Sequence, residues 1–242
     1  MRTVGIDLAA EPAKTAVATI EWGDGGAEVV SITVGANDDD IVRIATDADR
    51  VGIDAPFGWP DAFVEFVSAH HRHGPPSCGP LNTRAARGPL VRRRTDDVVR
   101  EQTGLIPLSV SADLIAHVAL RCVGVVAALG VTDRVNGVAV EVYPAAGLAS
   151  WGLRSRGYKG AANVAARAAL IDEISSAAPS LRFGECMQQC RDSDDALDSV
   201  VAALIARAVA VGATRPPTEL DTDAPSREGW IHLPTGTLAD LI

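Results

Sequence analysis

Two segments of the chain decide its fold: VGIDLA at residues 4–9 and VGIDAPFGWP at residues 51–60. In each, a short apolar, β-branched run ends at a single aspartate, Asp7 in the first and Asp54 in the second. Such a run is typical of a strand in a buried sheet, and the acid stands where the strand leaves that sheet. Because an unpaired charge is costly to bury, each of these acids needs a partner nearby.

Two further segments place acids in similar surroundings. VAVEVYP at residues 138–144 carries Glu141 at the end of an apolar run, and SDDALDSVVAALIARA at residues 193–208 begins an amphipathic helix. Ser193 is a good N-cap for that helix, and Asp195 and Asp198 lie three residues apart on one face, where like charges repel. Acids that converge from distant segments usually share a divalent cation, and Mg²⁺ and Mn²⁺ prefer carboxylate oxygens and water. We therefore expect a Mg²⁺ or Mn²⁺ site. The alternative is that these acids only cap turns and complement the positive end of a helix.

The order of the predicted elements indicates an α/β domain. Residues 2–34 predict three antiparallel strands, because a glycine-rich turn at 23–26 separates two strand-like runs. The elements expected after them are a helix at about 38–46, strands at 50–54 and 137–142, a helix at about 161–177, a long helix from Ser193, an ordered loop at 214–226 and a last short element at 229–233. Residues 57–136 differ in texture, with His- and Pro-rich loops, an arginine cluster and a helix from near Ser111 to Gly130. We interpret the chain as one domain over residues 1–242 with a largely helical insertion at 57–136.

Composition limits the classes of function. A chain of 242 residues with 47% hydrophobic content can bury one substantial core. With 22 basic and 31 acidic residues its net charge is −9, which counts against a general DNA-binding module but less against an enzyme that meets phosphate through a bound metal. No secretory signal is visible after Met1, and the longest apolar runs contain charged residues, so we expect a cytoplasmic protein without a membrane span. For the same reason the cysteines, Cys78, Cys122, Cys186 and Cys190, are expected to be free thiols.

Other motifs leave two interpretations open. Six arginines stand within seventeen residues, at Arg84, Arg87, Arg92, Arg93, Arg94 and Arg100. Arg92, Arg93 and Arg94 either bind substrate phosphates or pair with the protein's own carboxylates. Lys159 is a further candidate phosphate ligand or a solvated loop residue. The histidines near a predicted helix end, His70, His71 and His73, are metal ligands or ordinary surface residues, and they lack the i, i+4 spacing of zinc helices.

The ordered set of segments resembles a known family. These segments are GIDLAA–KTAVA, VGIDAPFGWP, RRRTDDVVR, VEVYPAAGL, YKG, DDALDSVVAALIARA and EGWIHLP. They are similar to DUF429, a bacterial and archaeal family described as predicted nucleases of the ribonuclease H-like fold. The resemblance covers nearly the whole chain and implies a mixed five-stranded sheet flanked by helices. In the Holliday-junction resolvase branch of that fold, acids stand on the first strand, the fourth strand and a late D-x-x-D helix. Asp7, Asp54, Asp195 and Asp198 match those places, although Asp54 replaces a glutamate and Glu141 has no counterpart.

The leading hypothesis is a metal-dependent phosphodiester hydrolase, a predicted nuclease. Its expected metal ligands are Asp7, Asp54, Asp195 and Asp198, with Glu141 as an outer ligand or proton acceptor among the catalytic residues. Arg92, Arg93, Arg94 and Lys159 would bind the substrate, which is a nucleic acid or a smaller phosphate ester. One alternative is an ATP-dependent phosphotransferase of the actin and sugar-kinase type, because GIDLAAEPAKTAVA resembles its phosphate loop, with Lys14 and Thr15 near the turn. A second is a non-catalytic binding protein on the same scaffold.

Overall fold

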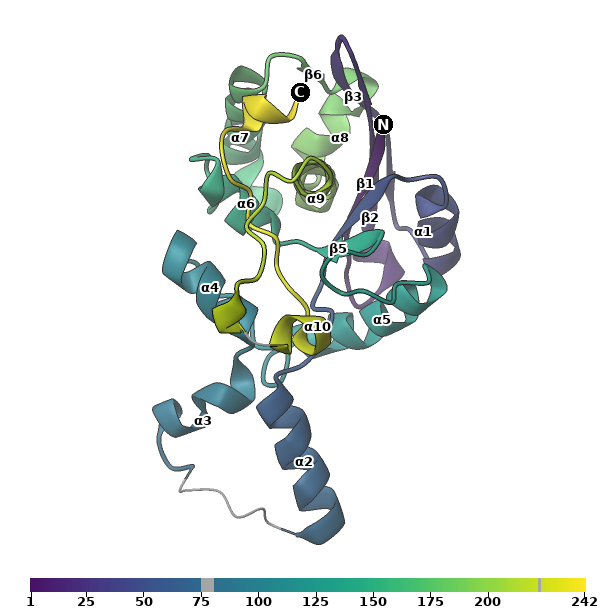
Figure 1. The fold of residues 1–242 in the computed structure, drawn as a ribbon. Helices are drawn as coiled ribbons and strands as arrows, with labels where there is room; N and C mark the ends of the chain where they lie inside the picture. Colours follow the sequence, from purple (N-terminus) through teal and green to yellow (C-terminus); the bar gives the residue numbers. More distant parts are fainter. Residues whose placement is uncertain (75–80, 222) are drawn as a thin grey trace.

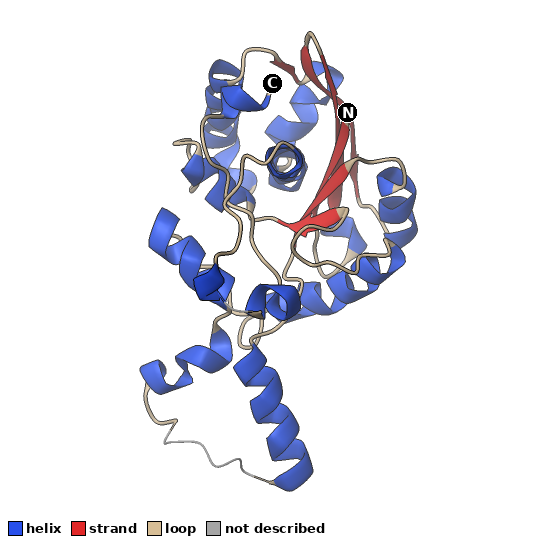
Figure 2. Cartoon of the chain, viewed as in Figure 1, coloured by secondary structure: helices blue, strands red, loops and turns tan. Residues whose placement is uncertain are grey.

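The structure is a computed structural model, and it describes residues 1–74, 81–221 and 223–242. The strands are β1 (Arg2–Asp7), β2 (Ala16–Gly23), β3 (Gly26–Val34), β4 (Arg50–Asp54), β5 (Ala139–Glu141) and β6 (Leu181–Arg182). The helices are α1 (Asp38–Ala45), α2 (Asp61–His73), α3 (Arg84–Val91), α4 (Arg94–Thr103), α5 (Ile115–Ala128), α6 (Pro144–Ser150), α7 (Val164–Ala177), α8 (Met187–Asp192), α9 (Asp194–Ala210) and α10 (Ala224–Glu228). The chain is thus a mixed α/β protein whose strands and helices follow the predicted order (Figures 1 and 2).

The strands form one mixed sheet in the order β5-β4-β1-β2-β3-β6. β1, β2 and β3 are antiparallel neighbours, whereas β4 and β5 run parallel to β1. The two VGID segments pair in register, so that Asp7 lies beside Asp54. The resemblance implied five strands, and the described residues form six. The additional strand, β6, has only two residues and pairs with β3 through Ala27 and Glu28, which is too short a run to show a strand period in the sequence.

Helices cover both faces of the sheet (Figure 1). Side chains alternate between the faces of a strand, so Val4, Ile6, Val51 and Ile53 point to the face that α1 and α5 cover, where they pack with Ile41, Cys122 and Val125. Gly5, Asp7, Gly52 and Asp54 therefore belong to the opposite face. α9 covers that face and packs with α6 and α8. This arrangement brings both strand-end aspartates to the side on which the acidic helix begins.

α9 lies very close to the sheet because glycines stand beneath it. A Cβ atom on Gly5 would collide with the backbone of Ser199 and Ala203, and one on Gly52 with the carbonyl oxygen of Ala202. Most of α9 is buried, including Leu197, Val200, Val201, Leu204 and Ile205. The helix is consequently fixed against β1 and β4, and its first turns are held at a defined height above the strand ends.

The segment 57–136 contributes both to the body of the molecule and to a projection. α2 and α3 contact each other and extend away from the sheet layers, whereas α5 packs against α1 on a sheet face (Figure 1). α5 begins at Ile115, later than the predicted start near Ser111, because residues 110–114 form turns before the helix. Cys78 lies outside the described residues. In the described part of the chain, none of the helices has the length and apolar character needed to cross a membrane.

Candidate metal centre

Three aspartates meet at the carboxyl ends of β1 and β4. Asp7 and Asp54 are side by side because their strands are paired in register, and Asp198 comes from the second turn of α9 above them. Each offers a carboxylate oxygen, and these three oxygens all lie within 4.8 Å of one another. We call Asp7, Asp54 and Asp198 the acidic triad. In the described part of the chain, the acidic triad is the one cluster of three or more His, Cys, Asp or Glu side chains whose ligand atoms are close enough to share a metal ion.

The segment between α6 and α7 supplies hydrogen bonds and a positive charge to the acidic triad. The Lys159 Nζ atom lies 2.5 Å from Asp198 Oδ2. Tyr158 is buried and donates a hydrogen bond of 2.8 Å from its hydroxyl group to Asp198 Oδ1. Arg167, itself fully buried, donates from Nη1 to the carbonyl oxygens of Tyr158 and Gly160, and so holds this segment in place. Asp198 is thereby fixed in one orientation.

Burial controls the ionisation of the acidic triad. It raises the pKa of Asp7 well above its usual range, and the negative charges of Asp198 and Asp54 raise it further. Burial also raises the pKa of Asp54 to about 7, although Lys159 opposes this shift. The pKa of Asp198 is raised by the same desolvation, against the charge of Lys159 and the hydrogen bond from Tyr158. Burial would lower the pKa of Lys159, but the carboxylates of Asp198 and Asp54 raise it, so this side chain stays protonated.

The acidic triad suits a hard divalent cation. All three donors are carboxylates, which are the ligands that Mg²⁺ and Mn²⁺ prefer, and these ions use few protein groups. Three ionised carboxylates and one ammonium group carry a net charge of two minus, which one divalent ion would neutralise. The raised pKa values of Asp7, Asp54 and Asp198 also favour a bound cation. Burial and mutual repulsion destabilise the ionised carboxylates, and a positive ion would stabilise them.

Asp195, expected as a fourth ligand, lies next to the acidic triad but outside it. It is partly exposed on the first turn of α9, and its negative charge contributes to the raised pKa of Asp7. Its own pKa is raised by burial and by Asp194. Asp195 is therefore close enough to act on the charges of the centre, while its oxygens do not converge with the other three.

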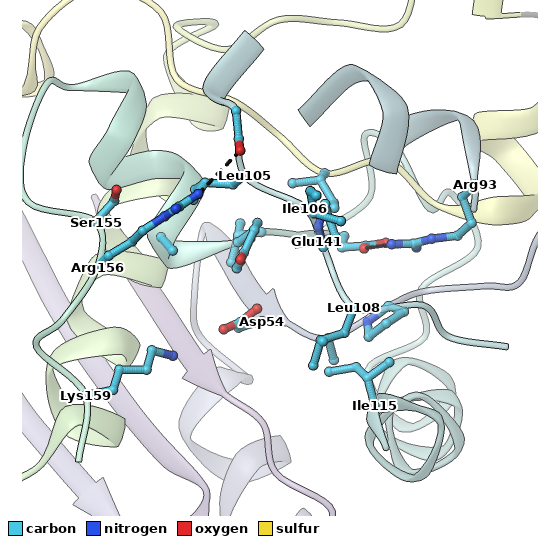
Figure 3. Close-up of a pocket in the computed structure, with 18 of the residues that line it drawn as sticks. Asp54, Arg93, Leu105, Ile106, Leu108, Ile115, Glu141, Ser155, Arg156 and Lys159 are labelled. Carbon is cyan, nitrogen blue, oxygen red and sulfur yellow. Dashed lines mark hydrogen bonds and ion pairs between the residues drawn. The ribbon is translucent and has the colours of Figure 1, made fainter. Parts of the chain in front are cut away.

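A cavity of about 790 Å³ adjoins the acidic triad (Figure 3). Asp54 and Lys159 lie at one end of it, and the Lys159 side chain points toward Asp54. The rest of its lining comes largely from the loop between α4 and α5, the segment between α6 and α7, and the end of β5. The cavity therefore reaches the acidic triad at Asp54.

A family model described as a protein of unknown function, DUF429, matches residues 5–222. The chain belongs to the DUF429 family. The matched region contains the whole acidic triad and Lys159. No curated protein and no solved structure gives a significant match to this DUF429 chain.

Glu141 has a different environment in this DUF429 chain from that of the three aspartates. In the parallel register it pairs with Ile53, so its side chain shares the sheet face of Ile53 and not the face of Asp54. Arg93 donates to both of its oxygens, at 2.9 and 2.8 Å, and the backbone N–H of Phe57 donates to Oε2 at 3.0 Å. Burial raises the pKa of Glu141, and Arg93 opposes that shift. Glu141 is thus part of a buried ion pair and does not join the acidic triad.

The three consecutive arginines pair with the protein's own carboxylates. Arg93 is only 2% exposed and also binds Asp96 Oδ1 at 2.9 Å. Arg92 lies 3.1 Å from Asp97, and Arg94 lies 2.7 Å from Asp221. The geometry follows the second of the two interpretations given for this cluster. Of the predicted substrate-binding residues, Lys159 is the one that the structure brings to the acidic triad.

The remaining sequence candidates lie elsewhere. His70, His71 and His73 are in the last turn of the projecting helix α2. Cys122, Cys186 and Cys190 are buried free thiols. Sequence reasoning missed two features of the site: the hydrogen bond from Tyr158, and the wall formed by Leu105–Leu108. The signal for the wall was an apolar run, LIPL, in a segment that otherwise reads as a loop.

Proposed function

We propose that the chain is a metal-dependent phosphodiester hydrolase with a ribonuclease H-like fold, and that Asp7, Asp54 and Asp198 bind one Mg²⁺ or Mn²⁺ ion. The observation that carries the proposal is the meeting of three carboxylates from β1, β4 and α9 within 4.8 Å. A bound ion of this kind lowers the pKa of a coordinated water and offsets the charge that develops on a phosphate ester. The ligands must be ionised to hold it, which the raised pKa of each acid opposes at low pH.

In this proposal the residues around the metal ion have distinct roles. Asp7 and Asp54 hold fixed positions because β1 and β4 pair in register. Tyr158 orients Asp198 through its hydroxyl group. Lys159 is within reach of both the acidic triad and the adjoining cavity, so its ammonium group would position a phosphate next to the ion. Asp195 would adjust the charge of the centre from its edge.

The geometry supports the phosphotransferase alternative less well. That alternative needs the turn near Lys14 and Thr15 to receive a phosphate. Arg121 of α5 donates to the carbonyl oxygen of Ala9 at 2.8 Å and to the hydroxyl oxygen of Thr15 at 2.6 Å. Thr15 is fully buried, and its hydroxyl oxygen also accepts from the backbone N–H of Ala9. The turn is therefore already held by the protein's own groups.

The substitution Asp7→Asn tests the proposed function. It removes one ligand and one of the crowded negative charges, so hydrolysis of bis(p-nitrophenyl) phosphate with Mn²⁺ should fall on the order of a hundredfold or more. Without metal the variant should melt at a higher temperature than wild type, because the raised pKa of Asp7 shows that its charged form is disfavoured. Added Mn²⁺ should raise the melting temperature of the wild type and have little effect on the variant. Both wild-type effects of the metal should increase as the pH rises through about 7, where Asp54 ionises.

Asp39→Asn is the matched control, since Asp39 is an exposed acid in the first turn of α1. This control should leave both the activity and the metal-induced shift unchanged. Wild-type activity in Asp7→Asn would refute the hydrolase proposal. A metal-induced shift without hydrolysis of any phosphate ester would instead favour the non-catalytic binding protein.

A further inference from the structure

The cavity beside the acidic triad is much larger than a metal centre requires. Its volume of about 790 Å³ falls within the range of about 300–1,000 Å³ that is common for small-molecule sites. Its two ends differ in chemistry. One side presents Asp54, Lys159 and Arg156, and the other presents Ile106, Leu108 and Ile115 together with the paired Glu141 and Arg93 (Figure 3). The cavity therefore has a charged end next to Asp54, and an opposite, mainly aliphatic end whose charged groups, Glu141 and Arg93, are paired with each other.

The apolar end is formed by large side chains that remain accessible to solvent. Ile106 is 69% exposed and Leu108 is 59% exposed, on either side of Pro107 in the loop between α4 and α5. Two large aliphatic side chains on one cavity wall form a surface that loses contact with water only when a ligand covers it. Because Asp54 lines the same cavity, a ligand of sufficient length that covers them also reaches Asp54.

The charged end carries two cations, Lys159 and Arg156. Arg156 is exposed, and the hydrogen bond that it makes is to the carbonyl oxygen of Gly104 at 3.3 Å. In the described residues Arg156 forms no ion pair with a carboxylate, in contrast to Arg92, Arg93 and Arg94. Three cations line the cavity in the described residues: Arg93, which is paired with Asp96 and Glu141, and Lys159 and Arg156. Two such groups suit a single phosphate, whereas a polymer backbone needs a row of cations, which an acidic protein of net charge −9 offers poorly.

We propose that this cavity binds a small phosphate ester carrying a flat aromatic group, such as a nucleobase, as the substrate of the metal centre; this inference rests on the proposed function. The phosphate lies at the end with Asp54, Lys159 and Arg156. The aromatic group lies against Ile106 and Leu108, and the ring of Tyr143 is also part of the cavity lining. The substrate is thus a mononucleotide-sized diester, and one of its two ester groups determines specificity.

A pair of diesters with the same leaving group tests this assignment. Bis(p-nitrophenyl) phosphate and methyl p-nitrophenyl phosphate both release p-nitrophenolate, but only the first retains an aromatic group. The ratio of their kcat/KM values, measured with Mn²⁺, should fall about fivefold or more in Leu108→Ser and in Ile106→Ser, because each variant removes apolar contact with the retained ring. The two esters differ in intrinsic reactivity, but this difference is the same for every protein. It therefore drops out when the ratio of a variant is compared with that of the wild type.

Leu120→Ser is the matched control, because Leu120 is a leucine of similar exposure, 64%, on α5 and outside the cavity. It should keep the wild-type ratio. An equal ratio in all four proteins would overturn the cavity assignment while leaving the hydrolase proposal intact. A single-stranded oligonucleotide cleaved with a higher kcat/KM than the aryl diester would also overturn it, in favour of a polymer substrate.

Absence of hydrolysis with every ester would count against the proposed function, and binding then tests the cavity separately. Adenosine 5′-monophosphate should raise the melting temperature more than inorganic phosphate does, and Leu108→Ser but not Leu120→Ser should lose that difference. Equal shifts from the two ligands in the wild-type protein would overturn the assignment.

Discussion

Lys159 reaches the acidic triad from the solvent side. Its side chain is half exposed, whereas Asp198, to which it is paired, is almost completely buried. The ammonium group therefore supplies part of the positive charge that three clustered carboxylates require, and a metal ion supplies the same charge more strongly. Lysine and metal act on the same acids, so each should weaken the interaction of the other with them.

The substitution Lys159→Met should make metal binding tighter and substrate binding weaker. Removing a positive charge next to a divalent ion should increase the affinity for Mn²⁺ by roughly tenfold, since charges a few ångströms apart repel strongly in a partly buried site. The same change should raise KM for phosphate esters. Calorimetric titration with Mn²⁺ and steady-state kinetics measure the two effects. Arg182→Met, which removes an exposed cation paired with Glu28 at the β6 edge of the sheet, is the control. An unchanged or lower affinity for Mn²⁺ in Lys159→Met would place the ion elsewhere.

The residues of the acidic triad could be predicted because their signal is local. An acid that ends a buried strand or begins a buried helix is visible in the sequence, and Asp7, Asp54 and Asp198 were predicted on that ground. Glu141 gives the same local signal, but strand register places it on the other face of the sheet, next to Arg93. Register depends on the partner strand, which the sequence does not identify. The face of the sheet on which Glu141 lies could therefore not be predicted.

At the scale of elements, the contact between α9 and the sheet positions the centre. Gly5 and Gly52 stand at equivalent places in the two paired VGID strands, and the α9 backbone passes directly over both. The sequence showed an apolar stripe on this helix. It gave no sign that the two glycines allow the α9 backbone to approach the sheet closely. By contrast, β6 and the start of α5 were missed because a two-residue strand and a turn before a helix have no periodic signal.

Gly52→Ala should destabilise the protein, although it changes none of the three aspartates. Its Cβ would meet the carbonyl oxygen of Ala202 and lie 3.2 Å from the Val142 side chain, so the free energy of unfolding should fall by about 3 kcal/mol. Gly124→Ala is the opposite case, because a Cβ on Gly124, exposed on α5, would have nothing within 4 Å. That variant should gain about 0.5–1 kcal/mol from better helix propensity. Urea denaturation followed by circular dichroism measures both, and equal stability of the two variants would contradict the close approach of α9.

At the scale of the whole molecule, Arg93 connects parts of the chain that are far apart in sequence. Its guanidinium group binds Asp96 at the start of α4, Glu141 at the end of β5 and the carbonyl oxygen of Glu228 at the end of α10. Burial opposes the charge of Arg93, but the carboxylates of Glu141 and Asp96 raise its pKa, so it remains charged. This buried network joins the segment 57–136 and the C-terminal segment to the sheet next to the cavity.

Arg93→Met and Glu141→Gln separate a structural role of this network from a catalytic one. Arg93→Met leaves two buried acids without their cation, so the free energy of unfolding should fall by about 3–5 kcal/mol. Glu141→Gln removes one charge from a network with two acids and one base, and should cost only about 1–3 kcal/mol through an imperfect hydrogen bond. Its activity, measured with Mn²⁺ and bis(p-nitrophenyl) phosphate well below its melting temperature, should stay within about tenfold of wild type, because Glu141 supplies no ligand to the acidic triad. If Glu141→Gln instead loses activity as completely as Asp7→Asn at near wild-type stability, Glu141 takes part in the chemistry, and the separation of the acidic triad from the Arg93 network is wrong.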